Sequence, residues 1–293
     1  SAAIGGLPST ARILAGVHFR KVDFGEHAAC CHYCAVEGVA RAALLVAFPV
    51  AAAVIGSIIA LVRPPGARVV SGIQHFAAGV VMAALVGEIM PELQAEHQLI
   101  WAVAGFAAGA ILVLALGAYG RKTEEAAEAH REAAHGLRVK TLTKAATVAL
   151  PIGMLAAMAI DLLLDGILIG VGAQLGFAQA LVLTIALTLE ILFLGLSLMG
   201  ELTDAGLSKV RAALVALGLG LVTAVGAIGG AALLQGAGTE VMSAVLAFGA
   251  AALLYLVVEE LLVEAHEEKE SVTLGAMFFL GFLAIYVLGA VAG

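Results

Sequence analysis

Long apolar runs separated by short polar connections make up most of this chain. A helix needs roughly 20 apolar residues to cross the ~30 Å hydrocarbon layer of a membrane, and eight runs are of about this length. Strand-type alternation of polar and apolar residues does not occur in these runs. We therefore predict an all-α membrane protein with eight transmembrane helices. The predicted spans are about 42–62, 70–91, 99–118, 146–172, 177–200, 212–235, 241–263 and 272–292.

The composition agrees with this pattern. Of the 293 residues, 62% are apolar and 13% are charged, and the mean hydropathy is +1.07, whereas soluble domains have about 45–50% apolar and about 25% charged residues. We expect a lipid bilayer around the chain and no nucleic acid as a partner. We predict an N-terminal segment, 1–38, followed by a transmembrane domain, 39–293, with one long connection at 120–145.

Basic residues gather in alternate connections. Eleven of the fifteen Lys and Arg residues follow spans 1, 3, 5 and 7, and none follows spans 2, 4, 6 or 8. By the positive-inside rule, the basic connections are cytoplasmic and both termini are extracytoplasmic. Four basic residues precede span 1 and are the one feature against this orientation. They are Arg12, Arg20, Lys21 and Arg41.

A short segment before span 1 holds Cys30, Cys31 and Cys34, with His27 and His32 beside them. Thiolates and imidazoles suit soft metal ions, so this segment is a candidate for metal capture. The spacing matches no standard zinc motif, and a flexible tail is the alternative. The sequence leaves the role of these cysteines open.

Three acids lie inside the apolar runs of spans 4 and 5. Asp161 and Asp165 are one helical turn apart on the same face, and Glu190 lies near the middle of span 5. At ~1.5 Å per residue, Asp161 and Glu190 both lie ~20 Å from a membrane face. An ionised carboxylate there costs at least ~2.5–3.5 kcal/mol, and no Lys or Arg lies in the interior of any span. The sequence therefore favours a bound cation or a proton, with neutral acids hydrogen-bonded between helices as the alternative.

Spans 2 and 7 share one spacing. Phe76 is followed by Glu88 after twelve residues, Phe248 is followed by Glu260 after twelve, and another glutamate comes four residues later in both. Because the two spans run in opposite directions, the match predicts an inverted repeat of spans 1–3 and 6–8 around spans 4–5. Such repeats are common in secondary transporters, although an Ala- and Leu-rich chain also produces chance matches.

With these motifs the chain resembles the ZIP family of divalent-metal transporters. The family's span 4 motif, His-Asn-x-Pro-Glu-Gly, falls on 161–166. Its span 5 motif, His-Glu-x-Pro-Glu-Gly, falls on 190–195, and its span 7 pattern, His-Glu-x-x-Pro-Glu-x-His, falls on 259–266. Both glycines, the acid spacing and the final histidine agree. Leu164 and Phe193 replace the two prolines, which predicts straighter helices.

The resemblance implies a transporter rather than an enzyme. It implies that Asp161, Asp165 and Glu190 bind a divalent cation at the bilayer midplane, with no catalytic residue and no cofactor apart from the metal substrate. Spans 1, 4, 5 and 6 would carry the ion against spans 2, 3, 7 and 8. Glu88 would admit the ion and Glu260, Glu264 and His266 would receive it, although acids at a membrane boundary are also ordinary solvated helix ends.

Some residues differ from the family's motifs, and these differences affect the expected number of bound metal ions and the expected metal. Leu194 replaces the family's span 5 glutamate, and Leu162, Ile191 and Thr223 stand where a second, adjacent site would lie, so we expect one metal site. Its all-oxygen donors favour manganese, iron(II) or magnesium over zinc. Cadmium stays open because of the breadth of the family.

Two further hypotheses compete with transport. The replaced prolines and lost acids also suit a non-transporting ZIP-like membrane protein that acts as a metal sensor or assembly partner. An intramembrane aspartyl protease fits poorly, because its acids are expected on two helices in Gly-x-Gly-Asp contexts that this chain does not have. The resemblance implies a bacterial cytoplasmic membrane and leaves a homodimer open.

Overall fold

The structure is a computed structural model of the chain, and it describes residues 37–137, 152–266 and 271–292. The chain divides into two units, Ser1–Glu37 and Gly38–Gly293, and the helices named below lie in the second. The cysteines and histidines before span 1 lie outside the described residues.

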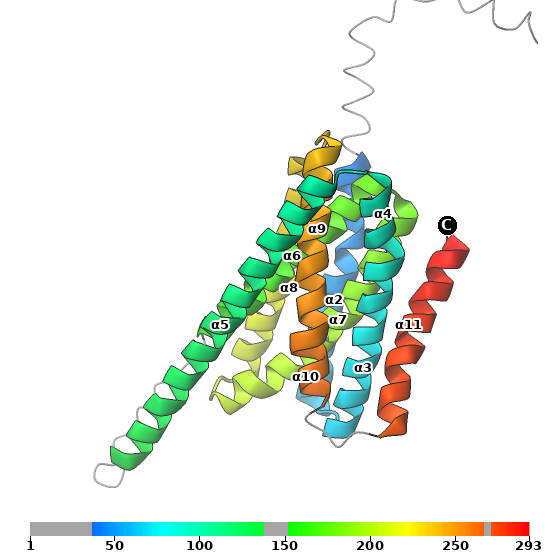
Figure 1. Cartoon of the computed structure of the whole chain (residues 1–293). Coiled ribbons are helices and arrows are strands. Elements are labelled where there is room, and N and C mark those ends of the chain that lie inside the picture. Colours follow the sequence, from blue (N-terminus) through cyan, green and yellow to red (C-terminus); the bar gives the residue numbers. More distant parts are fainter. Residues whose placement is uncertain (1–36, 138–151, 267–270, 293) are drawn as a thin grey trace, which may run out of the picture. The chain divides into compact units, whose positions relative to one another are not determined.

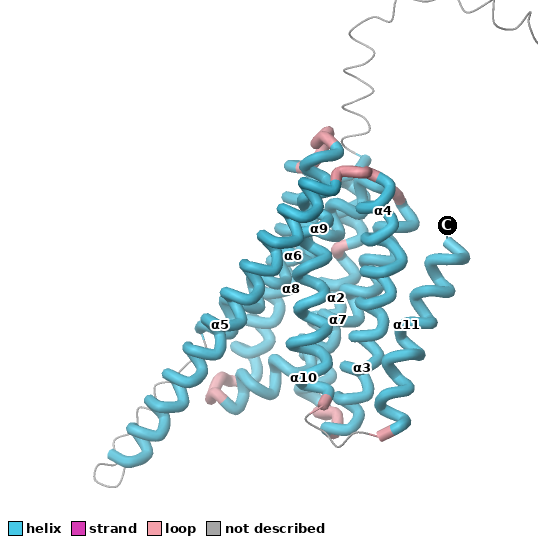
Figure 2. The backbone as a smooth tube through the Cα atoms, viewed as in Figure 1, coloured by secondary structure: helices cyan, strands magenta, loops and turns pink. Residues whose placement is uncertain are grey.

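Helices make up almost all of the described part of the chain, which contains no strand (Figure 2). Eight of its helical segments are long and apolar enough to cross a membrane, which confirms the predicted fold class and the predicted number of spans. The elements are α2 (Ala47–Val62), α3 (Ala67–Ala84), η2 (Leu85–Ile89), α4 (Met90–Ala95), α5 (Leu99–Leu137), α6 (Ile152–Leu175), α7 (Phe177–Asp204), α8 (Lys209–Leu233), α9 (Thr239–Tyr255), η3 (Leu256–Leu261), α10 (Leu262–Ala265) and α11 (Val272–Ala292).

Spans 2 and 7 each contain a π-helical element. Span 2 consists of α3, η2 and α4, and span 7 consists of α9 and η3, which α10 extends. Both η2 and η3 are short π-helical segments, in which the backbone bonds reach one residue further than in an α-helix. Glu88 lies in η2 and Glu260 lies in η3. The two glutamates of the shared spacing therefore occupy the same kind of irregular turn.

Some span boundaries differ from the predicted ones. The helix of span 3 continues as α5 to Leu137, well past the predicted end at 118, because the residues that follow are rich in the strong helix formers Ala, Glu and Arg. The predicted connection 120–145 thus begins as a helix. The predicted start of span 4, 146–151, lies outside the described residues, and α6 begins at Ile152.

Proline positions can be compared with helix continuity in three spans. Pro49 has no backbone N–H to donate, and the first span is interrupted at Val46, just before α2 begins. In contrast, α6 and α7 run without interruption through Leu164 and Phe193. The two helices that carry the three acids are thus continuous.

The spans pack as two groups (Figure 1). In the first group α6 packs along α8 and α2 packs along α7; in the second α3 packs along α11 and α5 packs along α9. Contacts between the groups are fewer and are made chiefly by α3 with α7 and by α5 with α6. The strongest contacts thus pair the spans as 4 with 6, 1 with 5, 2 with 8 and 3 with 7.

Glycines let helices within each group approach closely. A methyl group on Gly226 of α8 would overlap the carbonyl of Leu163 and would lie 3.0 Å from Cα of Gly166 in α6. Gly56 of α2 and Gly195 of α7 pack against each other's helix backbone in the same way. The helices that carry the acids are thus each held against a partner helix by small residues.

The second group repeats this arrangement around the shared phenylalanines. Gly281 of α11 packs on the carbonyl of Phe76, and Gly109 of α5 packs on the carbonyl of Phe248. These equivalent contacts agree with the inverted repeat of spans 1–3 and 6–8, which stays a prediction, because contacts do not measure how well the two halves superimpose.

Gly226→Ala should lower the melting temperature of the purified protein in detergent by several degrees. The added methyl would clash with the α6 backbone, and overpacking of this kind costs about 1–3 kcal/mol. Differential scanning fluorimetry measures the change.

Gly229→Ala is the matched control, because it lies one turn further along α8 and no atom lies within 4 Å of its added methyl. Replacing a helical glycine by alanine stabilises by about 0.5–1 kcal/mol where space allows, so this variant should melt at or above the native temperature. Equal melting temperatures of the two variants would contradict the close packing of α6 on α8.

Candidate metal site

Asp161, Asp165 and Glu190 come together between α6 and α7. One carboxylate oxygen from each lies within 4.8 Å of the others. Asp161 and Asp165 share a face of α6 because they are four residues apart, and α7 runs back alongside α6 after a single intervening residue, Gly176. Opposite oxygen ligands of a cation with ~2.4 Å bonds are about 4.8 Å apart. The three oxygens therefore fit within one coordination sphere.

The cluster is shielded from solvent. Glu190 is 0% exposed and Asp165 is 2% exposed, while Asp161 is partly buried. Both Glu190 carboxylate oxygens and Oδ2 of Asp165 have no hydrogen-bond donor among the described residues. The carboxylates of Asp165 and Glu190 can bond to each other only if a proton is held between them. The predicted alternative, neutral acids hydrogen-bonded between helices, would take the form of such a shared proton between Asp165 of α6 and Glu190 of α7.

The place expected for an adjacent second site is apolar. Leu162 and Ile191 are 3% and 1% exposed, and together with Leu194 they line a cavity of about 10 Å³. This volume is at the lower limit for one water molecule, ~10–15 Å³. Leu162, Ile191 and Leu194 offer no side-chain ligand, and the cavity that they line has no room for a hydrated ion.

Thr223 of α8 is a buried polar residue at the position that the sequence assigned to a second site. It is 0% exposed, and its Oγ1 has no hydrogen-bond partner among the described residues. A buried hydroxyl without a partner costs free energy. Only its position in the family's pattern pointed to it, since a threonine in an apolar helix is otherwise unremarkable.

Glu260 approaches the cluster from the other group of spans. It lies close enough to Asp161, Asp165 and Glu190 to repel all three electrostatically, and its side chain is exposed. A π-helical segment changes the direction in which the following side chains point and often occurs at functional sites. The structure thus brings a fourth carboxylate near the three buried ones.

Of the remaining predicted ligands, Glu88 and His266 do not join the cluster. Glu88 is half-buried on η2, where its Oε1 faces Gly289 of α11. Glu264 lies in α10, and its side chain is outside the described residues. His266 lies beside His75, with ring centres 5.3 Å apart. Within the described part of the chain, the only group that could hold a metal ion through three such ligands is Asp161, Asp165 and Glu190.

Comparison with known proteins adds a family to this geometry. The family model described as ZIP zinc transporter matches residues 119–289, which is more than half of the chain and includes all three buried carboxylates and Glu260. The curated proteins compared contain no match. The family transports divalent metals, and the eight apolar helices make this chain a multi-pass membrane protein. The chain belongs to the ZIP zinc transporter family.

Proposed function

We propose that the protein moves a divalent metal cation across the cytoplasmic membrane of a bacterium and binds the cation at Asp161, Asp165 and Glu190. The observation that carries the proposal is the meeting of three carboxylate oxygens within 4.8 Å, two of the side chains being almost fully buried. Ionised carboxylates brought together without hydrogen-bond donors need a counter-charge. One divalent cation supplies it and is also the family's substrate.

The position of the cluster along its helices supports a site near the bilayer midplane. Asp161 follows the first residue of α6 by nine residues, and Asp165 precedes its last by ten. Glu190 follows the first residue of α7 by thirteen and precedes its last by fourteen. At ~1.5 Å per residue, each acid lies roughly 14–21 Å from either end of its helix.

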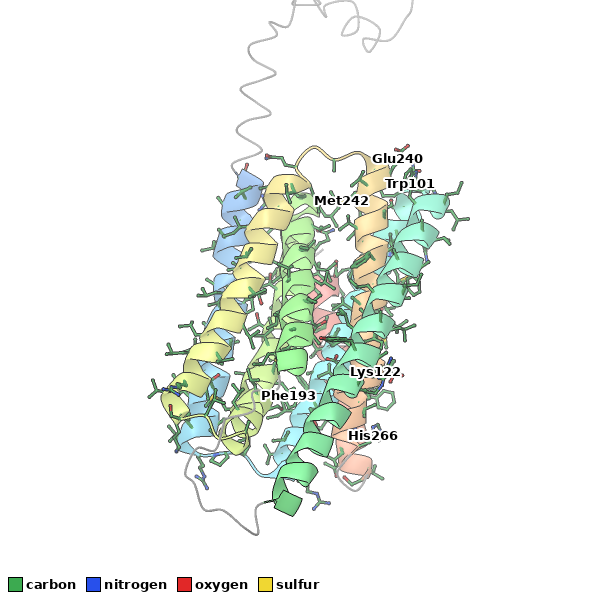
Figure 3. All side chains as sticks on the ribbon, turned by 90° about the vertical axis from the view of Figure 1, so that its left-hand side faces the viewer. Trp101, Lys122, Phe193, Glu240, Met242 and His266 are labelled. Carbon is green, nitrogen blue, oxygen red and sulfur yellow. The ribbon has the colours of Figure 1, made fainter. Side chains whose placement is uncertain are left out.

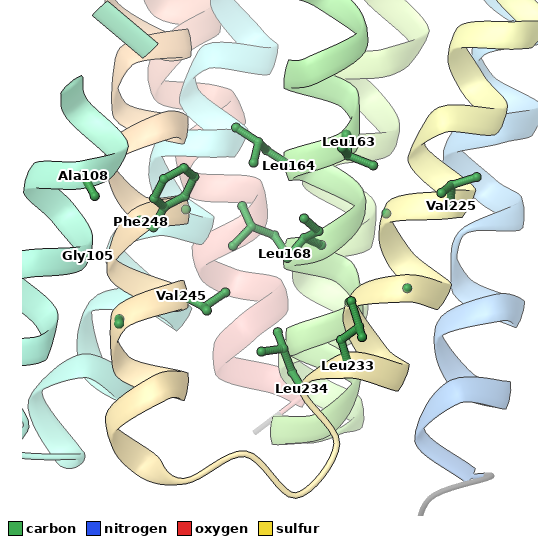
Figure 4. Close-up of a pocket in the computed structure, with 16 residues that line it drawn as sticks. Gly105, Ala108, Leu163, Leu164, Leu168, Val225, Leu233, Leu234, Val245 and Phe248 are labelled. Atoms are coloured by element: carbon green, nitrogen blue, oxygen red, sulfur yellow. The ribbon is translucent and has the colours of Figure 1, made fainter. Parts of the chain in front are cut away.

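The two groups of spans support an elevator-like movement. We propose that spans 1, 4, 5 and 6 carry the ion against spans 2, 3, 7 and 8. A cavity of about 690 Å³ lies between α6 and α8 on one side and α5 and α9 on the other. Figure 4 shows its aliphatic lining, with Leu164 and Leu168 facing Val245 and Phe248. Apolar surfaces of this kind slide without breaking hydrogen bonds.

Further residues with oxygen or nitrogen ligands lie along the proposed path of the ion. Glu88 would meet the ion on one side of the cluster, and Glu260, Glu264 and His266 would meet it on the other. The oxygen donors of the cluster favour manganese, iron(II) or magnesium, and zinc is the substrate named in the family description. Cadmium stays among the candidates.

The proposed orientation places both termini outside the cytoplasm. Arg41, one of the basic residues against this orientation, donates from Nη1 to the carbonyl of Ala173 at 3.1 Å. This carbonyl belongs to the last turn of α6, where a helix dipole favours a positive charge. Arg41 thus caps the C-terminal end of α6. This role explains its position whether that end of the bundle faces the cytoplasm or the outside. A homodimer remains a prediction.

Manganese should raise the melting temperature of the native protein but not that of Glu190→Gln. A ligand at 100 times its dissociation constant adds about 2.7 kcal/mol to the free energy of unfolding, and the isosteric amide removes one ligand charge. Without metal, Glu190→Gln should be at least as stable as the native chain, since it removes a buried charge.

Glu240→Gln is the control, because it makes the same change at an exposed position in the first turn of α9. It should keep the full manganese effect. If Glu190→Gln also kept it, the proposed binding site would be wrong.

Liposomes that contain the purified native chain should take up at least one of manganese, iron(II), magnesium, zinc and cadmium. Asp161→Ala should reduce the uptake to that of empty liposomes, because it removes one of three ligands. Uptake that is unchanged in Asp161→Ala would reject the site. Metal binding without any uptake by the native chain would favour a sensor or an assembly partner.

A disulfide between the two groups of spans should stop uptake, because it would prevent their relative movement. Leu168 of α6 and Gly249 of α9 suit this test, since a methyl on Gly249 would lie 2.9 Å from Cγ of Leu168. In a chain whose native cysteines are replaced by serine, Leu168→Cys with Gly249→Cys should lose uptake on oxidation and regain it on reduction.

The control disulfide joins two helices of the same group, and its α6 cysteine replaces the residue before Leu168. Ile167→Cys with Gly230→Cys joins α6 to α8, where a methyl on Gly230 would lie 3.0 Å from Cα of Ile167. This bond should leave uptake unchanged. Full uptake with the bond between the groups closed would contradict the elevator-like movement.

A further inference from the structure

Two histidines from different spans face each other where span 2 begins and span 7 ends. His75 lies in α3 and is 4% exposed, whereas His266 follows α10 and is exposed. Their ring centres are 5.3 Å apart and their planes are tilted by 56°. Figure 3 shows His266 at the opposite end of its span from Glu240 and Met242. Neither histidine belongs to the carboxylate cluster.

Hydrogen bonds to the backbone set the same tautomer in both rings. Nδ1 of His75 is bonded to the carbonyl of Ser71 at 2.8 Å, and Nδ1 of His266 is bonded to the carbonyl of Leu262. A carbonyl only accepts, so in each neutral ring Nδ1 carries the proton and Nε2 carries the lone pair. Histidines that bind metals are commonly oriented by such a bond from their other nitrogen. Both rings therefore have the tautomer that binds a metal through Nε2.

A third hydrogen bond fixes the two rings relative to each other. Oγ of Ser71 donates to the carbonyl of Ala265 at 2.7 Å, and both residues are buried. Ser71 is also the residue that orients His75, and Ala265 immediately precedes His266. The spacing of the rings is thus set by bonds that join the two spans directly.

This spacing suits one tetrahedral ion. With Zn–N bonds of ~2.0–2.1 Å, two imidazoles on one tetrahedral zinc have ring centres roughly 5 Å apart, and the observed distance is 5.3 Å. The rings line a cavity of about 280 Å³ together with Ser271 and Phe278. Since one water occupies about 30 Å³ of liquid, the cavity has room for an ion and for waters that complete its coordination.

We propose that His75 and His266 form a second metal site, which binds a borderline-soft divalent cation of the zinc class through two imidazoles. Its chemistry differs from that of the carboxylate cluster, because imidazole favours zinc and carboxylate favours harder ions. The site lies at one end of the bundle, where it holds the ion on its way to or from the carboxylates. That place in transport rests on the proposed function, but the binding of zinc does not.

The test counts zinc bound to the purified full chain by equilibrium dialysis. The starting variant carries Asp161→Asn, Asp165→Asn and Glu190→Gln, and serine in place of its three cysteines, so that neither of the other candidate sites contributes. His75→Asn in this background should reduce the bound zinc by one ion per chain. Asparagine is chosen because its amide nitrogen can still donate to Ser71 while Nε2 is lost.

The matched controls separate this site from non-specific binding. His266→Asn should lose the same ion, and the double variant should lose no more than either single one. His97→Asn, in the connection between spans 2 and 3 at a positive φ of 54° that asparagine tolerates, should leave the bound zinc unchanged. Magnesium at the same concentration should not displace the ion.

Equal zinc in the starting variant and in His75→Asn, with both chains melting at the same temperature, overturns the proposal. Zinc that persists in the starting variant and is lost in both His75→Asn and His266→Asn supports it, whatever uptake the carboxylate variants show. Because His266 is exposed at a helix end, His266→Asn tests the site without altering the buried packing around His75.

Discussion

The burial of three carboxylates within one apolar bundle is the constraint on which the rest of the structure depends. Each ionised carboxylate removed from water costs several kcal/mol unless it is paired or hydrogen-bonded. Both Glu190 oxygens and one oxygen of Asp165 are buried without a donor among the described residues. A proton neutralises one charge, whereas a divalent cation neutralises two and offers bonds to all three side chains at once. The proposed function therefore assigns a bound cation to this cluster.

Close helix packing keeps this unfavourable cluster in place. Glycines let α8 approach α6 and α2 approach α7, so the two helices with the acids are braced from outside the cluster rather than by polar bonds within it. The stabilising contacts and the ligands are thus different residues. This separation allows the carboxylates to remain poorly solvated. Glu260 of η3 lies close enough to Asp161 to repel it electrostatically.

Much of the fold and the core of the candidate site were predictable from the sequence. The eight spans follow from apolar runs of sufficient length, and the meeting of Asp161, Asp165 and Glu190 follows from a four-residue spacing and similar depths. The π-helical segments were not predictable, because their longer backbone bonds leave no mark on hydrophobic periodicity. The extension of α5 to Leu137 lies beyond the predicted span, because a charged helix outside the membrane lacks the apolar run that marks a span. His75 was passed over because its partner is distant in the chain.

The most direct measurement is anomalous diffraction from crystals of the native chain grown with manganese. Data collected at the manganese absorption edge locate the ion without reference to the positions of the ligands. The structure predicts an anomalous peak between α6 and α7, within bonding distance of the carboxylates of Asp161, Asp165 and Glu190. Bound manganese at other positions, with no peak between these three side chains, would contradict the assignment of the cluster as the metal site.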